Sequence, residues 1–360
     1  MEVVHLIGYL SGRDRIRLQR RLYLSLVVAG MLGLCMWVMR DAEHMLDTAV
    51  VRPVGAAALS APGGKLNTGG GGGAAGAATL PAGVTQLTHG TAMDGFGVWS
   101  PDGTQVAFMR DGKIWLMGAD GSEARQLTRA EGSWDAAPAW RPGGKELAFS
   151  RVNTEGDGAS VMVVDPATGK ERQLSRETEV VGHVAWDATG RLLYYITPQR
   201  LMKVDVRTGR GQEMHSLPDG WDMQAGGLTI SPDGKRAVFG AGPRVGRSFQ
   251  YDLFEISLAK PGAERKQITT GGGIMPTFDR TGKLLAYRSP REASGIYVMD
   301  YAKHAIRQVL ADEGRSLHFH PAWSPDGKRL LISRLLVGTS GGGPDGNRFT
   351  SNLLVQTLGN

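Results

Sequence analysis

A short turn motif recurs six times along the chain and constrains the fold more than any other feature. Each copy begins with a large apolar residue, Trp in four cases, and ends four residues later with Gly; its fullest form is Trp-Ser-Pro-Asp-Gly. The copies are Trp99–Gly103, Trp140–Gly144, Trp186–Gly190, Ile230–Gly234, Phe278–Gly282 and Trp323–Gly327. Their spacings of 41, 46, 44, 48 and 45 residues define a repeating structural unit.

Each unit reads as a series of short strands. An apolar run such as 105–110 follows the turn, a second apolar run such as 113–118 comes next, and most units close on a segment like Gln126-Leu127-Thr128. Four short strands with a period in the forties are typical of a β-propeller blade. A single blade has two apolar faces and cannot bury both, whereas a closed ring buries each face on a neighbour. We therefore predict an all-β, six-bladed propeller of four-stranded blades over residues 81–360.

The repeat resembles that of TolB-type propellers. The resemblance rests on the pattern Pro-x-Trp-Ser-Pro-Asp-Gly followed by an apolar strand, then Ile-Tyr/Trp-Val/Leu-Met-x-x-Asp and Gln-Leu-Thr, over roughly residues 82–360. It implies six blades, but these motifs are specific for fold and carry little information about function. TolB proteins have an α/β domain before the propeller, and this chain has a different N-terminal segment, so the resemblance does not extend to TolB itself or to its partners.

The two ends of the repeat region predict how the ring closes. The last unit ends without a Gln-Leu-Thr strand, and an unassigned segment, Val84–Thr88, precedes the first unit. An unpaired edge would invite aggregation, which native sheets avoid. We expect residues 84–88 to pair with residues 352–358 and complete the sixth blade.

The N-terminal region predicts a membrane anchor and a tether. Residues 22–39 contain no charged residue and would span roughly 27 Å as a helix, close to the hydrocarbon thickness of a bilayer. Five Arg residues precede the segment, so the positive-inside rule places the tail of residues 1–21 in the cytoplasm and the propeller in the periplasm or outside the cell. A cleaved signal peptide is the main alternative, although no small-x-small site follows. Residues 40–80 are rich in Gly and Ala and predict a flexible linker.

Charge and cysteine content exclude other classes. The net charge is +6, and half of that excess lies in residues 1–21, so the remaining chain is only weakly basic. With no recognised nucleic-acid motif, this distribution argues against a nucleic-acid-binding protein. The single cysteine, Cys35, rules out a disulfide within the chain.

Candidate binding residues follow from the propeller geometry. In each blade the turns between the first and second strands, and between the third and fourth, share one end of the ring and are short; the connections at the opposite end vary in length. Because variable loops on a rigid scaffold often carry binding sites, we expect function at that opposite end. Its candidates are the polar residues that enter the first strands and two arginines on a long loop of blade four: Asp94, Asp135, His183, His318, His320, Arg244 and Arg247.

These residues suggest two classes of function. The propeller fills the folded length and no appended catalytic domain is evident, so we expect a protein-binding scaffold of the cell envelope with no catalytic residue assigned. The alternative is a propeller that binds a small ligand, a glycan or a metal at the channel mouth, with lyase-like activity among its forms. Lyases built on related propellers place histidines and a metal there, and His183, His318 and His320 could bind a divalent cation. No other cofactor is expected.

Overall fold

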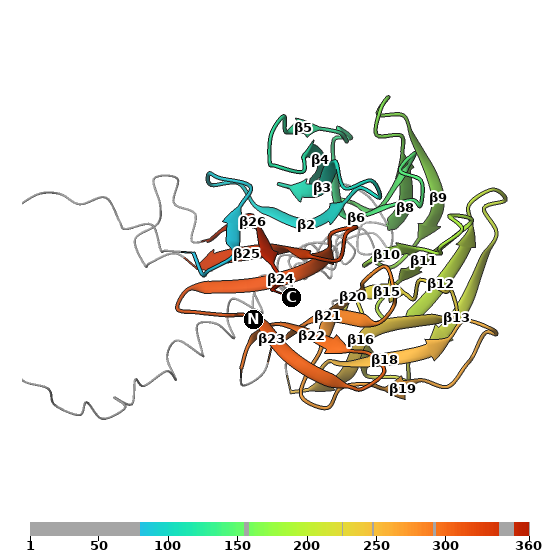
Figure 1. Cartoon of the computed structure of the whole chain (residues 1–360). Coiled ribbons are helices and arrows are strands. Elements are labelled where there is room, and N and C mark those ends of the chain that lie inside the picture. Colours follow the sequence, from blue (N-terminus) through green and yellow to red (C-terminus); the bar gives the residue numbers. More distant parts are fainter. Residues whose placement is uncertain are drawn as a thin grey trace, which may run out of the picture.

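The computed structural model describes residues 80–154, 158–224, 226–246, 248–290, 293–337 and 349–359. Within these residues the fold is a ring of six antiparallel β-sheets, one per repeat (Figure 1). Four blades have a simple order of consecutive strands. They are blade one, β2 (Asp94–Trp99), β3 (Gln105–Arg110), β4 (Lys113–Gly118) and β5 (Arg125–Gln126); blade two, β6 (Ser133–Trp140), β7 (Leu147–Asn153), β8 (Ala159–Val164) and β9 (Glu171–Glu177); blade three, β10 (Val184–Trp186), β11 (Leu192–Ile196), β12 (Arg200–Asp205) and β13 (Gly211–Ser216); and blade five, β20 (Ile274–Phe278), β21 (Leu284–Ser289), β22 (Gly295–Asp300) and β23 (Ala305–Ala311).

Blade four has more strands than the repeat predicts. Its four expected strands are β15 (Leu228–Ile230), β16 (Arg236–Val245), β18 (Asp252–Ser257) and β19 (Lys266–Gln267). The long β16 extends beyond the sheet, where it also pairs with β14 (Trp221–Asp222) and β17 (Ser248–Phe249). The loop expected over residues 241–248 is therefore largely a hairpin.

The sixth blade is closed by the N-terminal strand. It consists of β24 (Ser316–Trp323), β25 (Arg329–Val337), β26 (Phe349–Thr357) and β1 (Val84–Gln86). Strand β1 runs antiparallel to β26, with Val84 opposite Gln356 and Gln86 opposite Leu354. This is the pairing that the two ends of the repeat region predict.

The core is divided among the blade interfaces. Six clusters of buried apolar side chains lie one between each pair of neighbouring blades, including the pair formed by blades six and one. The large residue before each turn contributes to these interfaces. The Nε1 groups of Trp140, Trp186 and Trp323 also donate hydrogen bonds to the strand carbonyls of Val98, Ala139 and Thr277 in the preceding blades, at 3.4, 3.0 and 3.1 Å. The repeated Trp thus fixes each of these blades to its neighbour by packing and by a hydrogen bond.

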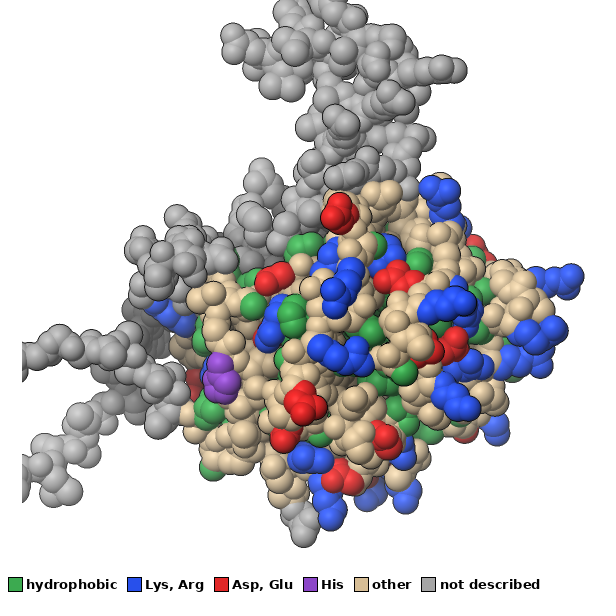
Figure 2. Space-filling model, turned by 90° about the horizontal axis from the view of Figure 1, so that it is seen from above, with side chains coloured by type: hydrophobic (Ala, Val, Ile, Leu, Met, Phe, Trp, Pro, Cys, Tyr) green, Lys and Arg blue, Asp and Glu red, His purple; other side chains and the backbone are tan. Residues whose placement is uncertain are grey.

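The described surface offers little apolar area for docking. Val245 and Ile306 are its exposed large apolar residues, at 49% and 50%. On the side shown in Figure 2, basic and acidic side chains are interspersed and apolar atoms appear only in small spots. No helix in the described part of the chain is long and apolar enough to cross a membrane. The predicted tail, anchor and nearly all of the predicted linker, residues 1–79, lie outside it.

Candidate functional site

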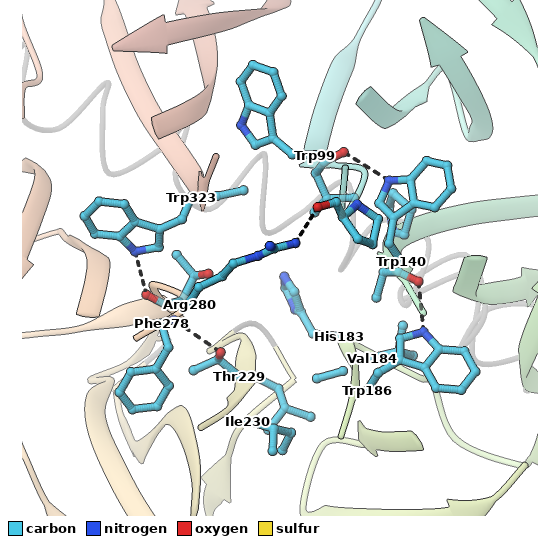
Figure 3. A pocket seen from close by; sticks show the side chains of 18 of the residues that line it. Trp99, Trp140, His183, Val184, Trp186, Thr229, Ile230, Phe278, Arg280 and Trp323 are labelled. Carbon is cyan, nitrogen blue, oxygen red and sulfur yellow. Dashed lines mark hydrogen bonds between the residues drawn. The ribbon is translucent and has the colours of Figure 1, made fainter. Parts of the chain in front are cut away.

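A pocket of about 560 Å³ lies on the axis of the ring. All six inner strands line it (Figure 3). In five blades the lining begins at the residue three positions before the large apolar residue, in blade four it begins at Leu228, and in every blade it includes the turn residue two positions after the large apolar residue. We call this space the channel pocket and the large apolar residue of each repeat the anchor. Because the inner strands run toward the short turns, the pocket lies at the short-turn end of the ring. Its volume is in the usual range for sites that enclose a small ligand or part of a chain.

A bulge in the inner strands supplies the side chains that narrow the channel. In blades one, two, five and six the strand register shifts at the residue three positions before the anchor. These residues, Phe96, Ala137, Met275 and His320, have φ between 48° and 56°, a conformation that is uncommon for residues other than glycine. All four line the channel pocket, as does His183 of blade three. The bulge therefore places one side chain from each of these four blades at the same level of the channel, beside His183 of blade three.

Three aromatic rings pack together at this level and form the floor of the pocket. The ring centroids of Phe96 and His320 are 3.9 Å apart, and His183 lies 5.6 Å from Phe96 and 5.7 Å from His320. Both ring nitrogens of His320 are buried without a hydrogen-bond partner among the described residues. Burial lowers the pKa of His183 to about 4, and it lowers the pKa of His320 well below its ordinary value, with further contributions from His183 and Arg288. Both imidazoles are therefore neutral at pH 7.

Apolar side chains from several blades pack together at the opposite end of the ring, where we expect the binding site. Tyr251, Ile274, Met275, Phe319 and Leu335 form one cluster there. Met93, Phe249, Leu317 and Phe349 pack against it, so the cluster joins blades four, five, six and one. Phe249 belongs to β17 and Phe349 is the first residue of β26. The channel pocket lies at the end with short turns, and a binding site at the end with variable loops stays a prediction.

Two of the predicted site residues are used in buried ion pairs. Asp94 is 1% exposed and accepts two hydrogen bonds from Arg110, at 2.6 and 2.8 Å. Asp135 is fully buried and has the same bidentate arrangement with Arg151, at 2.6 and 2.8 Å. Burial by itself lowers the pKa of Arg151, but hydrogen bonds to Asp135 and Glu171 raise it overall. Both aspartates are thus bound within their own blades and do not line the channel pocket.

His318 lies apart from the other two histidines. Its Nδ1 is 3.0 Å from Asp312 Oδ1, and Asp312 is also 2.9 Å from Arg288 and accepts a hydrogen bond from Ser294 Oγ at 2.6 Å. This buried network connects blades five and six. Of the five predicted channel residues, the structure therefore brings together only His183 and His320.

Of the two predicted arginines of blade four, the structure describes Arg244. It is exposed near the end of β16, where its Nε donates to the carbonyl of Gly246 at 3.3 Å. Arg244 is not among the residues that line the channel pocket. Arg247 lies outside the described residues.

The possible metal site does not form from the three predicted histidines. No group of three His, Cys, Asp or Glu side chains that could hold a metal occurs in the described part of the chain. His318 is held by Asp312, and the third ring beside His183 and His320 is that of Phe96, which has no ligand atom. A stable divalent site needs at least one more donor at this level.

Sequence reasoning missed Phe96 and Arg280. Phe96 could have been found because it occupies the same repeat position as His183 and His320. Arg280 could have been found because it replaces the proline of the turn motif. Its side chain is exposed, extends across the pocket in Figure 3, and donates a hydrogen bond to the carbonyl of Pro101 in blade one.

Comparisons with known proteins support the fold. No protein-family model matches the chain. The curated protein described as uncharacterized peptidase YuxL, from Bacillus subtilis (strain 168), is 29% identical over 168 residues, which are 45% of this chain and 24% of that protein. The match therefore spans only about a quarter of that relative.

Several solved structures share the ring architecture. The putative TolB from Agrobacterium tumefaciens has a TM-score of 0.55 at 15% identity, over 77% of this chain and 97% of that chain. TolB from Acinetobacter baumannii has a TM-score of 0.50 at 17% identity, over 76% of this chain and 67% of that chain. An oligogalacturonate lyase in complex with manganese has a TM-score of 0.52 at 17% identity, over 76% of this chain and 80% of that chain. Identities this low concern the fold alone. The repeat motif, the six blades and these similarities together show that the chain has a six-bladed β-propeller fold like that of the TolB structures.

Proposed function

We propose that the chain is a membrane-tethered, exported propeller that binds a partner protein of the cell envelope, and that a segment of this partner enters the channel pocket. The observation that carries the proposal is the pocket itself, formed by all six blades and closed at its floor by Phe96, His183 and His320. Residues 22–39 would hold the chain in the inner membrane and residues 40–80 would give the propeller reach. The TolB-like fold is consistent with a scaffold but does not identify the partner.

The lining of the pocket suits an extended polypeptide segment. The inner strands pair with a neighbour on one edge only, so part of their backbone N–H and C=O groups faces the axis and can bond to another backbone. Pro138, Pro276 and Pro321 and the neutral floor add apolar surface for side chains. A partner segment would thus find hydrogen-bonding groups along the walls and an apolar end point.

A pocket-filling variant tests this function. Ala137 lines the pocket with φ 51°, and the same position in blade one already holds Phe, so Ala137→Phe should fold while occupying the pocket. Full-length wild-type and variant chains, expressed in the source organism, would be used to capture envelope proteins after cross-linking. Ala302→Phe, in an exposed turn, is the matched control.

We expect Ala137→Phe to reduce recovery of the partner at least tenfold while Ala302→Phe retains it, with both variants showing the wild-type melting temperature. Equal recovery by all three chains would place the interface outside the pocket. Release of the full-length chain from membranes by high salt alone would contradict the anchor.

A small molecule in the same pocket is the second candidate. The unbonded ring nitrogens of His320 and the neutral ring of His183 favour it, because they can accept or donate hydrogen bonds to a ligand at the floor. The lyase-like chemistry expected as an alternative would need such a ligand and a further catalytic group. Native mass spectrometry of the full-length chain would detect a retained ligand, and its loss in Ala137→Phe would locate it.

A further inference from the structure

One position in the ring of turns that surrounds the pocket mouth differs in charge from the other five. Two residues after each anchor, the structure places four prolines and one alanine, all at the rim of the channel pocket. Blade five has Arg280 instead. The six residues are Pro101, Pro142, Ala188, Pro232, Arg280 and Pro325. An arginine here introduces a cation at a level of the channel that is otherwise apolar.

The guanidinium of Arg280 has no acidic partner among the residues that the structure describes. Its hydrogen bond is to a neutral acceptor, the carbonyl of Pro101. Three turn carboxylates around the mouth are engaged within their own turns. Asp279 accepts bonds from Thr281 Oγ1 at 2.5 Å and from the Leu284 N–H at 2.9 Å, and Asp187 has equivalent contacts with Thr189 and Leu192. Asp102, which follows Pro101, accepts bonds from Ser100 Oγ at 2.6 Å and from the Thr104 N–H at 3.0 Å.

The other basic side chains near the mouth are largely paired. Arg141 lies 2.6 Å from Glu146, Arg191 lies 3.0 Å from Asp205, and Arg236 lies 3.6 Å from Glu255. Arg280 is the one Lys or Arg among the residues that line the described pocket, beside the carboxylates of Asp187 and Asp279.

We propose that Arg280 is a specificity-determining residue that binds an aspartate or glutamate side chain of the segment entering the channel pocket. This inference rests on the proposed function. The planar guanidinium would exchange its single bond to Pro101 for two parallel N–H···O bonds to the carboxylate, an arrangement that is both stronger and more directional.

The depth of Arg280 sets where the acidic residue lies in the ligand. Arg280 follows the floor-level residue Met275 by five positions, the last two of them in the turn after β20, so the two levels are at most about 16 Å apart at about 3.3 Å per residue. An extended ligand has the same rise, so its acidic residue lies about four or five residues from the tip that reaches the floor. The floor is neutral and aromatic, which selects an apolar tip. The expected ligand is therefore a segment with an apolar tip and an acidic residue behind it.

Peptide selection tests this assignment. A library of random decapeptides would be selected in parallel on full-length wild type, Arg280→Pro and Ala137→Phe. Proline occupies the equivalent turn position in four other blades, so Arg280→Pro should preserve the turn. We expect wild type to enrich Asp or Glu four or five residues from an apolar position, Arg280→Pro to lose that acidic enrichment, and Ala137→Phe to select none of these peptides.

A double-mutant cycle measures the interaction between Arg280 and the acidic residue of the peptide. Replacing the acidic residue of a selected peptide by its amide should weaken binding to wild type about tenfold or more and leave binding to Arg280→Pro unchanged. If wild type and Arg280→Pro select the same peptides, the role of Arg280 is wrong while channel binding stands. If Ala137→Phe selects the wild-type peptides, or if wild type selects none, binding of a segment in the channel fails as well.

Discussion

At the scale of single residues, the charged side chains of the inner strands are divided between the fold and the channel. Asp94 and Asp135 are bound by arginines inside their blades, whereas Arg280 has no acidic partner in the described chain. A buried carboxylate with two guanidinium bonds is poorly available to a ligand. Loss of Asp94 or Asp135 should consequently lower the stability of the fold, and loss of Arg280 should weaken binding.

The Asp135–Arg151 pair offers a direct test of this division. Asp135→Asn should lower the free energy of unfolding by about 3 kcal/mol, because it leaves the Arg151 charge buried and incompletely paired. Asp135→Asn combined with Arg151→Met should recover much of that loss. Asp205→Asn, at an exposed pair where Arg191 is 69% accessible, should cost less than about 1 kcal/mol. Urea denaturation measures all three, and equal effects at both sites would contradict a structural role for the buried pair.

His183 should make the fold sensitive to mild acid. Its folded-state pKa is about 4, below the ordinary histidine value of 6.5, so the unfolded chain takes up the proton first as the pH falls. Stability is therefore lost progressively from about pH 6.5 down to pH 4, by up to about 2 kcal/mol at pH 5 from this group. His183→Gln should reduce the loss measured by denaturation at pH 7 and pH 5, and His304→Gln, in an exposed turn, should not. An unchanged pH dependence in His183→Gln would mean that its imidazole is hydrated in the folded chain.

The candidate residues could be only partly predicted from sequence. If alternate strand positions are counted back from the anchor residue, Asp94 and His183 fall on the same side of their strands. The bulge at residues such as Phe96 breaks this alternation. A bulge depends on backbone conformation that non-glycine residues rarely adopt, and the residue types at that position, Phe, Ala, Met and His, share no property that indicates it. The repeat position itself was visible in the sequence, and the direction of its side chain was not.

At the scale of elements, the Gln-Leu-Thr segments show how one motif is used in different blades. In blades one and four the Thr hydroxyl accepts a hydrogen bond from the third strand, from Ile114 N–H and Leu253 N–H at 3.0 and 2.9 Å. Thr88 makes the same bond with Leu353 N–H at 2.9 Å, although 265 residues separate them. Strand β1 therefore takes the place of a fourth strand in blade six, with the same local contacts.

A proline in β1 should open the ring. Leu87 N–H bonds to the Leu353 carbonyl and Thr357 N–H to the Gly83 carbonyl, so by alternation the N–H of Thr85, opposite Val355, points to β26. Thr85→Pro removes this donor and should lower the melting temperature by several degrees, whereas Thr85→Ala, at an exposed side chain, should leave it within about two degrees. Hydrogen exchange should then show loss of protection in β26. Equal melting temperatures for both variants would mean that β1 contributes little to closure.

The strands of the simple blades could be predicted because period, apolar runs and turn residues agree in each repeat. The additional strands β14 and β17 could not. Their pairing depends on the far end of β16, where Gly242 and Pro243 lie opposite Asp222 and Trp221 and where glycine and proline indicate a loop. Contacts such as Tyr251 Oη to Asp222 at 2.5 Å hold this hairpin, and they join residues that are far apart in the sequence.

At the scale of the whole molecule, the ring brings three side chains from distant repeats to one level, and their identities decide whether a metal binds. With two imidazoles and Phe96, we expect the full-length wild-type chain to retain well below one equivalent of Mn²⁺ or Zn²⁺ after desalting. Phe96→His would supply a third imidazole to rings whose centroids already lie 3.9 to 5.7 Å apart, and should retain close to one equivalent of Zn²⁺. Elemental analysis measures both, and stoichiometric metal in wild type would show that other ligands complete the site.

The contact between the two ends of the propeller also limits how early the ring can close during synthesis. Thr88 is synthesised 265 residues before Leu353, its hydrogen-bonding partner. At about 5–20 residues per second, roughly 10 to 60 s pass between the synthesis of β1 and the synthesis of β26, the strand with which it pairs. During that interval five blades can form in order, while β1 has no strand to pair with. The ring can thus close only after β26 has been synthesised, and a chain that stops before β26 would keep its first five blades but lack this closure.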